Sequence, residues 1–393
     1  MIILALNCGS SSVKYQLYDW EKQSLLKKGS EERIGSGGSP DHTRALEIII
    51  KKLETKIDAV GHRVVHGGEN FHQSVLINEE VLNIIRGVSN LAPLHNPPNI
   101  AGIEAAQKIL PDIPHIAVFD TAFHQTIPLH AYIYAVPYEW YQAYGIRRYG
   151  FHGTSHLYVS KRAAVLLNKK PSEVNVITLH IGNGVSITAV KGGISVDTSM
   201  GLTPLEGAVM GTRCGDIDPS IVLYMTGKQK VSSKELDGIL NRKSGLLGIT
   251  GKFMDRRDIL KAAAEGDTRC QLAIEIECYR LKKYIGSYAA AMGGVDAIVM
   301  TAGVGEKSPE IREKVLTGLD FMGAKLDLKK NKCVTHGEKD ISTADSKVKI
   351  FVIPTNEELV FIEDVVAILE NRYDVHTKFN YSFQDPDYKP AAK

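Results

Sequence analysis

The chain has 393 residues, 44% apolar and 23% charged, a globular composition that is too long for one ordinary domain. Its 47 Lys and Arg against 45 Asp and Glu give a net charge of +2, which supplies no electrostatic case for a nucleic acid or an anionic membrane as partner. Five scattered cysteines without a CxxC spacing, no signal peptide, and no apolar run of about 18–20 residues together predict a soluble, cytoplasmic protein without disulfides.

Two glycine-containing turns each follow a short apolar run. Ile2–Leu6 leads into the Gly- and Ser-rich residues 7–12, and apolar residues then alternate over residues 13–17. The run over residues 174–179 leads in the same way into His-Ile-Gly-Asn-Gly at 180–184, after which the alternation resumes. Apolar alternation on either side of a tight turn predicts a β-hairpin. Since the same device opens each half of the chain, we expect a duplicated core.

A third apolar run, Ala297–Met300, leads into the loop at residues 301–306, and Ser308-Pro309-Glu310 then predicts a helix start. Gly-rich turns after buried strands leave backbone N–H groups free for phosphate, so three of them favour a nucleotide. None of them matches GxxxxGK[ST] or a dinucleotide fingerprint. A P-loop NTPase and an NAD enzyme are therefore disfavoured.

Helical stretches fill the intervening sequence. The polar and aromatic segment Tyr373–Lys393 is interpreted as a tail, whose order the sequence leaves open. Strands and helices in succession predict two α/β domains with a cleft between them. The predicted helices cover Arg44–Leu53, Glu80–Val88, Ile100–Ile109, Thr154–Leu167, Thr268–Met292 and Glu358–Asn371.

Several segments place His, Arg and Asp in Gly- and Pro-rich surroundings, where core packing does not explain them and where sites are common. These segments are residues 61–69, 93–99, 119–124, 147–156 and 197–218.

These segments suggest two kinds of metal site, a zinc site on histidines and a magnesium site on carboxylates. His62/His66 and His152/His156 have the i, i+4 spacing of zinc ligands on a helix, but Gly67-Gly68 follows the first pair and Gly153 lies within the second. We therefore expect hydrogen-bonding histidines instead of zinc ligands. Mg²⁺ prefers one or two carboxylates together with substrate phosphates. The candidate carboxylates are Asp120, Glu357 and Glu358.

The motifs taken together resemble the acetate kinase family, in order from residue 1 to about residue 369. The matching blocks are Asn-x-Gly-Ser-Ser-Ser-x-Lys at 7–14, Gly-His-Arg-Val-Val-His-Gly-Gly at 61–68, Phe-Asp-Thr-Ala-Phe-His at 119–124, Arg-Tyr-Gly-Phe-His-Gly-Thr-Ser-His at 148–156, His-Ile-Gly-Asn-Gly at 180–184 and Pro-Thr-Asn-Glu-Glu-Leu at 354–359.

The resemblance implies two duplicated α/β domains of the ribonuclease-H-like, actin-like ATPase type, with ATP in an interdomain cleft. The expected N-terminal domain, on the acceptor and metal side, comprises residues 1–124 and 359–393, and the nucleotide-binding domain residues 125–358. The implied reaction is reversible, Mg²⁺-dependent transfer of the ATP γ-phosphoryl group to acetate, giving acetyl phosphate and ADP, with Mn²⁺ as an alternative metal. A homodimer is also implied.

The family's functional positions carry over to residues of this chain. The resemblance implies catalytic roles for Asp120, His152, Arg213 and His95, and Mg²⁺ contacts for Asn7 and Glu357. The acetate site is implied to comprise Arg63 and the apolar residues Val65, Leu94, Phe151 and Pro204. The nucleotide is implied to contact Lys14, His180, Ile181, Gly182, Asn183, Gly184, Asp255, Arg256, Arg257, Gly303, Val304, Gly305, Glu306 and Lys307.

The residue types suit this chemistry, because phosphoryl transfer needs cations aimed at the spreading negative charge. A carboxylate acceptor is already deprotonated at neutral pH, so direct in-line transfer without a general base is expected. Two departures from the family occur on the base side of the nucleotide: Lys307 replaces an amide, and Lys252-Phe253-Met254 replaces small hydroxyl residues. They leave the nucleotide preference open.

Three alternatives remain at this point. A propionate kinase differs by one methylene in the acceptor, worth about 1–3 kcal/mol, although the bulk of Val65 favours acetate. A sugar or glycerol kinase would need a carboxylate base, for which Asp120 is available. An Hsp70- or actin-like ATPase module would have no acceptor and no need for Arg63 and Arg213 in Gly-framed loops.

Overall fold

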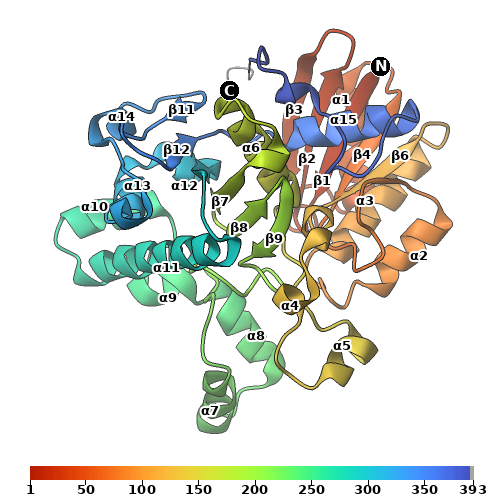
Figure 1. Cartoon of the computed structure of the whole chain (residues 1–393). Coiled ribbons are helices and arrows are strands. Elements are labelled where there is room, and N and C mark those ends of the chain that lie inside the picture. Colours follow the sequence, from red (N-terminus) through yellow and green to blue (C-terminus); the bar gives the residue numbers. More distant parts are fainter. Residues whose placement is uncertain (390–393) are drawn as a thin grey trace. The chain divides into compact units, whose positions relative to one another are not determined.

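The computed structural model describes residues 1–389, and contacts divide the chain into two compact units (Figure 1). Unit 1 comprises Met1–Gln125, Phe151–Thr154 and Asn356–Asp385. Unit 2 comprises Thr126–Gly150, Ser155–Thr355 and the described residues 386–389. The last part of the expected tail, residues 390–393, lies outside the described residues.

Unit 1 contains a six-stranded sheet in the order β3-β2-β1-β4-β6-β5. Strands β1, β4 and β6 are parallel, and β2, β3 and β5 are antiparallel to their neighbours. The predicted first hairpin is confirmed, since β1 and β2 pair up to Cys8 and Val13 around the Gly–Ser turn. The strands are β1 (Ile2–Cys8), β2 (Ser12–Asp19), β3 (Ser24–Glu32), β4 (Ala59–Val64), β5 (Val75–Leu76) and β6 (His115–Phe119).

Helices cover both faces of this sheet. Helix α15 (Glu357–Leu369) packs through Phe361, Ile362, Val365 and Val366 on one face, which is the face of Ile3. Helices α1 (His42–Leu53) and α3 (Asn96–Ile109) pack on the opposite face, against the alternate residues of the same strands, and α2 (Glu79–Gly87) packs beside α3. Because side chains alternate along a strand, Asn7 faces the α15 side together with Ile3.

Helix α3 approaches strand β1 closely at Gly102. A Cβ atom at this position would lie 2.7 Å from Cys8 Cβ and closer still to Cys8 Sγ. We expect Gly102→Ala to lower the free energy of unfolding by about 1–3 kcal/mol through overpacking. Urea unfolding checks this, and the double variant Gly102→Ala/Cys8→Ala is expected to recover part of the loss. Equal destabilisation of the single and double variants would show that the contact with Cys8 is not the cause of the loss.

Unit 2 contains a second six-stranded sheet, in the order β11-β12-β10-β7-β8-β9. Strands β7, β10 and β12 are parallel, and β8, β9 and β11 are antiparallel to their neighbours, so its order and directions repeat those of unit 1. The predicted second hairpin and the predicted duplicated α/β core are thereby confirmed. The strands are β7 (Asn175–Ile181), β8 (Val185–Lys191), β9 (Ile194–Thr198), β10 (Ala297–Thr301), β11 (Lys339–Asp340) and β12 (Lys349–Val352).

The six predicted helices are all present, with ends within a few residues of those expected. One expectation was wrong: residues 301–306 do not form a loop, because helix α12 (Ala302–Lys307) follows β10 directly. The helices not yet given are α4 (Leu129–Tyr132), α5 (Tyr138–Tyr144), α6 (Gly153–Leu166), α7 (Ser220–Gln229), α8 (Ser233–Arg242), α9 (Gly245–Thr250), α10 (Arg256–Ala264), α11 (Thr268–Met292), α13 (Pro309–Leu316) and α14 (Leu328–Lys332), with 3-10 turns η1 (Ala122–Thr126), η2 (Pro171–Glu173), η3 (Asp320–Met322) and η4 (Ser382–Gln384).

The segment after α15 is packed on unit 1. Phe379, Tyr381 and Phe383 are buried in unit 1, and their rings contact one another in sequence. Asp364 of α15 accepts hydrogen bonds from Tyr381 Oη at 2.8 Å and Ser74 Oγ at 2.6 Å. The described part of this segment is therefore ordered, a point that the sequence left open.

The buried Asp364 makes the stability of the protein depend on pH. Burial raises its pKa from 3.8 to about 7, although the hydrogen bonds from Ser74 and Tyr381 act to lower it. A raised pKa means that the folded state holds this proton more tightly, so the associated stability is present below about pH 4 and is lost as pH rises to about 7.

We expect Asp364→Asn to gain stability relative to the parent protein as pH rises from 4 to 8, by up to roughly 4 kcal/mol. Urea unfolding at both pH values measures this change. Asp374→Asn, at an exposed acid, is the matched control and should show no such change. Parallel pH curves for the parent and Asp364→Asn would contradict the prediction.

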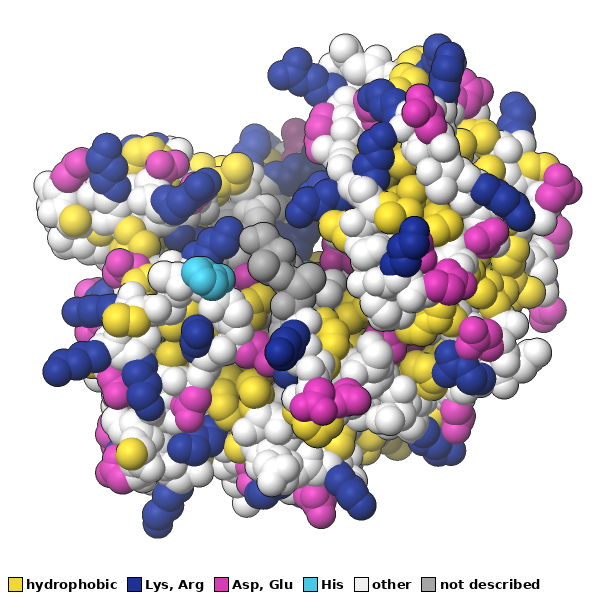
Figure 2. Space-filling view, turned by 90° about the horizontal axis from the view of Figure 1, so that it is seen from above, with side chains coloured by type: hydrophobic (Ala, Val, Ile, Leu, Met, Phe, Trp, Pro, Cys, Tyr) yellow, Lys and Arg dark blue, Asp and Glu magenta, His cyan; other side chains and the backbone are white. Residues whose placement is uncertain are grey.

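The distribution of charged side chains on the surface and the polarity of the helices agree with the composition of the sequence. On the face in Figure 2, Lys and Arg are interspersed with Asp and Glu, as a net charge of +2 suggests. Within residues 1–389, each helix is too short or too polar to cross a bilayer.

Candidate functional site

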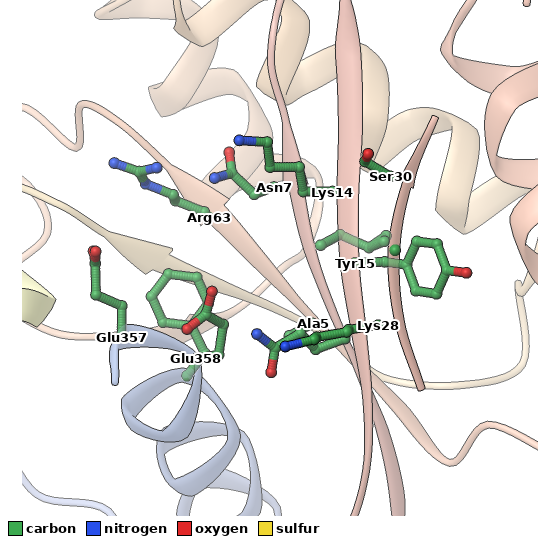
Figure 3. Close-up of a pocket in the computed structure, with 13 residues that line it drawn as sticks. Ala5, Asn7, Lys14, Tyr15, Lys28, Ser30, Arg63, Glu357 and Glu358 are labelled. Carbon is green, nitrogen blue, oxygen red and sulfur yellow. The ribbon is translucent and has the colours of Figure 1, made fainter. Parts of the chain in front are cut away.

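A cavity of about 490 Å³ lies on the α15 side of the first sheet, within unit 1 (Figure 3). Asn7 of β1 is paired with Lys14 of β2, and therefore both side chains project from the same face of the sheet. Arg63 near the end of β4 and Glu357 at the start of α15 complete the charged lining. Four of the predicted site residues thus surround one cavity, at the carboxyl ends of β1 and β4, where ligands commonly bind α/β sheets.

Arg63 is held by a carboxylate beneath it. Its Nε lies 2.9 Å from Asp120 Oδ1 and its Nη2 lies 2.7 Å from Asp120 Oδ2, a bidentate pair. Burial lowers the pKa of Arg63, but Asp120 and the charges of Glu357 and Glu358 outweigh burial and raise it above the ordinary value. Asp120 is buried directly after β6, so this pair fixes the direction of the guanidinium.

The first turn of α15 brings two carboxylates to the cavity. Asn356 caps the helix, and Glu357 and Glu358 follow it. Thr154 Oγ1 donates to Glu357 Oε2 at 3.0 Å. With the amide of Asn7, these groups supply the oxygen ligands that Mg²⁺ prefers. Within residues 1–389 no group of three or more His, Cys, Asp or Glu residues is placed to hold a metal ion.

Two predicted catalytic histidines lie at the starts of helices in unit 1. His95 occupies the N-cap position of α3 and is half-buried. His152 directly precedes α6 and has φ 57°, the left-handed region that non-glycine residues rarely adopt. Gly153 is required after it, because a Cβ there would overlap Asp120 O and approach Phe123 Cβ at 3.0 Å. The backbone N–H of Gly153 also donates to the carbonyl of Asp120 at 2.9 Å, so this tight junction holds the chain at His152 beside the Asp120 turn.

The residues predicted for the apolar acetate pocket are divided between the two units. Val65 and Phe151 are buried, whereas Leu94 is 42% exposed. None of these three lines the unit 1 cavity. Pro204 belongs to unit 2, half-buried beside Arg213. Their role as an acetate pocket stays a prediction.

The histidine pairs weighed for zinc make hydrogen bonds. His62 Nε2 lies 2.9 Å from His115 Nδ1, and burial lowers the pKa of His62 well below its ordinary value. His156 lies between the hydroxyls of Thr178 and Ser186 at 2.7 and 2.6 Å. Both contacts agree with hydrogen-bonding histidines.

Unit 2 has its own cavity, of about 550 Å³, between the β7–β8 turn, α10 and α12. Arg256 donates to the carbonyl of Gly182 at 2.8 Å and pairs with the buried Glu277. Arg257 pairs with Asp255, and this pairing lowers the pKa of Asp255 to about 2. Eight of the predicted nucleotide residues line this cavity, namely Gly182, Asn183, Asp255, Arg256, Arg257, Gly303, Val304 and Lys307.

The other predicted nucleotide residues lie elsewhere. Lys14 lines the unit 1 cavity. His180 is buried, with Nδ1 2.8 Å from Ser155 Oγ, and Glu306 accepts from the Thr355 N–H at 3.3 Å. Ile181 is buried in β7, and Gly184 and Gly305 do not line the unit 2 cavity.

Arg213 lies in the irregular segment before α7 and is half-buried. Its Nη1 is 3.4 Å from the Pro204 carbonyl, and in the described chain no carboxylate comes within ion-pair distance of it. Burial lowers its pKa. A half-buried guanidinium without an acidic partner is well suited to receive an anionic ligand.

Sequence reasoning did not select several residues that line the two cavities. In unit 1 they include Gln16, Lys28 and Ser30, which a period of two along β2 and β3 would have placed on the same face as Lys14. In unit 2, Leu260 lies one helical turn after Arg256 and Arg257, and Ser308 and Glu310 follow Lys307. The available signal was their spacing from residues already selected: alternation along β2, one helical turn in α10 and adjacency to Lys307.

A twice-repeated sheet with Gly-containing turns, charged groups at strand ends and a separate Arg-lined cavity defines the class of duplicated α/β ATPases and kinases. The chain belongs to the Acetokinase family, whose sequence profile matches residues 2–363. The acetate kinase of Geobacter metallireducens is 60% identical, with 99% of each chain covered. That of Thermotoga maritima is 55% identical over 94% of this chain and 99% of its own length.

Solved structures agree with the family assignment. The acetate kinase of Porphyromonas gingivalis has a TM-score of 0.89 at 45% identity, covering 94% of this chain and 99% of that one. A propionate kinase from Francisella tularensis has a TM-score of 0.87 at 44% identity, covering 92% and 98%. The predicted fold class is thereby confirmed.

Proposed function

We propose that this protein is a phosphotransferase that moves the γ-phosphoryl group of ATP to acetate, reversibly, giving acetyl phosphate and ADP. The observation that carries the proposal is the unit 1 cavity of an Acetokinase family member, in which Arg63 and Lys14 stand beside the oxygen donors Asn7 and Glu357. The relatives that are 57–60% identical are named acetate kinases, so propionate is the less favoured acceptor.

The mechanism follows from the charges. Acetate needs no deprotonation at neutral pH, so the reaction does not require a general base. Asp120 accepts two hydrogen bonds from Arg63, so its role is to orient the guanidinium, and it is a poor general base. Arg63 and Arg213 bind the acceptor carboxylate and the phosphoryl group that is transferred. His95 and His152 donate hydrogen bonds to the oxygens of that phosphoryl group. Direct in-line transfer is the proposed route.

Asn7 and Glu357 are the proposed Mg²⁺ ligands, with Glu358 beside them, and Mn²⁺ is an alternative. The ion, when bound, would neutralise charge on the phosphates during transfer. We assign unit 1 to the acceptor and metal, and unit 2 to the nucleotide, whose phosphates would lie near Gly182 and Asn183.

Incubation with ATP, Mg²⁺ and acetate, followed by trapping with neutral hydroxylamine, tests the proposal. Acetohydroxamate is the expected product, and it should exceed the yield from propionate at equal concentration. Glycerol and sugars should not be phosphorylated. ATP hydrolysis without hydroxamate from acetate, propionate or butyrate would instead support an ATPase module.

Lys307 is proposed to set the nucleotide preference. Among the described residues it is the cation of the unit 2 cavity without a carboxylate partner, and Met254 and Val304 supply apolar surface for a base. A lysine only donates hydrogen bonds, so it favours the O6 acceptor of guanine or hypoxanthine over the N6 amine of adenine, which is itself a donor.

We expect Lys307→Asn to lower kcat/KM for GTP and ITP relative to ATP by about tenfold. This factor is at the low end of the discrimination that one hydrogen-bonded contact to a base provides. Initial rates with each nucleotide at saturating acetate measure this ratio. Lys314→Asn, at an exposed lysine of α13, is the control and should leave the ratio unchanged. An unaltered ratio in Lys307→Asn would remove Lys307 from base recognition.

We further propose a cytoplasmic homodimer. All five cysteines are free thiols, which agrees with a reducing compartment. Exposed Ile221, Leu223 and Tyr224 on α7 provide an apolar surface for a second copy. Light scattering after size exclusion gives the oligomeric state, and a monomer at micromolar concentration would contradict the proposal.

A further inference from the structure

The segment after α15 lies beyond the part of the chain that the family profile matches. The family match ends at residue 363, and the Thermotoga maritima relative is matched over nearly its whole length by 94% of this chain. The Geobacter metallireducens relative covers 99% of the chain, so the segment is shared by some relatives only. A segment that the family fold does not require, yet whose side chains are buried, calls for an explanation.

This segment is docked through aromatic rings. Tyr373 contacts Phe379 at 5.6 Å between ring centroids, Phe379 contacts Tyr381 edge to face at 4.8 Å, and Tyr381 stacks on Phe383 at 4.9 Å. The last three are at most 9% exposed. Such a series fixes the segment as one body on unit 1.

Two neighbouring acids of α15 join the helix to this segment. Asp364 accepts from Tyr381 Oη, from Ser74 Oγ, and from Tyr373 Oη at 3.4 Å. Glu363 accepts from the backbone N–H of Ser382 at 2.7 Å and from its hydroxyl at 2.5 Å. Two buried carboxylates satisfied largely by the segment leave the helix little freedom to shift or rotate.

The same helix carries Glu357 at the cavity. Glu357 and Asp364 are seven residues apart, about two turns along one side of α15, so a shift at Asp364 is transmitted to Glu357. The segment also reaches the Asp120 turn, because the His376 ring lies 5.8 Å from that of Phe123 in η1. Phe123 in turn is packed against Gly153, next to His152.

We infer that Asp364 and the segment 373–385 are positioning groups for phosphoryl transfer, holding the first turn of α15 so that Glu357 faces the unit 1 cavity. The inference rests on the proposed function, because Glu357 matters there as a ligand-binding carboxylate. It assigns to the added segment a part in turnover, beyond its part in stability.

Steady-state kinetics of full-length Tyr381→Phe and Ser74→Ala test the inference. Each removes one donor to Asp364 and leaves the rings or the turn in place. We expect each to lower kcat about fivefold, with KM for acetate and for ATP changed less than twofold, since the positioned group acts mainly in the transition state. The double variant should lose less than the product of the two, because both act on one carboxylate.

Tyr279→Phe, at a tyrosine of α11 that is 66% exposed, is the matched control and should keep the parental kcat. Thermal unfolding of every variant ensures that rates are compared for folded protein. Parental kcat in folded Tyr381→Phe and Ser74→Ala would overturn the inference and leave the segment a purely stabilising role.

Hydrogen–deuterium exchange supplies a readout that does not depend on activity. Amides in residues 357–361 should exchange at least threefold faster in Tyr381→Phe than in the parent protein or Tyr279→Phe. Unchanged exchange there would overturn the inference even if kcat falls. A parent protein that forms no acetyl phosphate would refute the proposed function instead, and the exchange result would still decide whether the segment positions α15.

Discussion

Replacing Arg213 with alanine is expected to lower kcat for acetyl phosphate formation by about 10³-fold or more. The physical reason is that the transferring phosphoryl group spreads negative charge over its equatorial oxygens, and an arginine aimed at that charge contributes on this scale in other phosphoryl transferases. In this chain Arg213 is half-buried, and in the described residues no carboxylate neutralises it. Its charge is therefore available to a ligand.

The hydroxamate assay with ATP, Mg²⁺ and acetate measures this loss. Arg242→Ala, at an exposed arginine of α8, is the matched control and should retain parental turnover. Arg213→Lys should remain strongly impaired, because a lysine keeps the charge but loses the planar, bidentate geometry. Near-normal turnover of Arg213→Ala would exclude the proposed role.

Local sequence patterns were sufficient for the strands and most helices that carry the site. The two hairpins were predicted because period-two alternation and a Gly turn lie within about 15 contiguous residues each. The helix α12 was missed, because Gly303 and Gly305 lower its intrinsic helix propensity. Its last turn is held from outside instead: Arg312 donates to the carbonyls of Gly305 and Glu306 at 3.0 and 2.8 Å.

The parts of the site that sequence reasoning did not reach depend on distant partners. The segment after α15 is held through Asp364, which accepts hydrogen bonds both from Tyr381 in the segment and from Ser74, 290 positions before Asp364. Because the site that binds the segment includes such a distant residue, no local sequence pattern indicated that the segment is ordered. The bond between Arg63 and Asp120 likewise joins residues 57 apart. The family resemblance named both residues, but only the structure shows that Asp120 engages the guanidinium and that the two act as a pair.

The second large effect is expected from breaking that pair. Asp120 has a side chain only 2% exposed, so Arg63→Ala would leave a buried carboxylate without its counter-charge. The expected loss is about 3–5 kcal/mol in the free energy of unfolding, the range for removing one partner of a buried ion pair. Turnover should fall by roughly 10²-fold or more, because the remaining cations of the cavity do not replace a bidentate guanidinium.

A double-mutant cycle separates the two consequences. Asp120→Asn removes the charge but keeps an oxygen acceptor, so it should destabilise the protein less than Arg63→Ala does, while Arg63 loses its fixed direction and turnover still falls. The double variant Arg63→Ala/Asp120→Asn should recover much of the stability lost in Arg63→Ala, since no buried charge is left unpaired, yet none of the activity. Urea unfolding and the hydroxamate assay measure the two quantities on the same samples. Recovery of turnover in the double variant would show that Arg63 serves only to neutralise Asp120. A double variant as unstable as Arg63→Ala would show that the pair contributes nothing to stability as a pair.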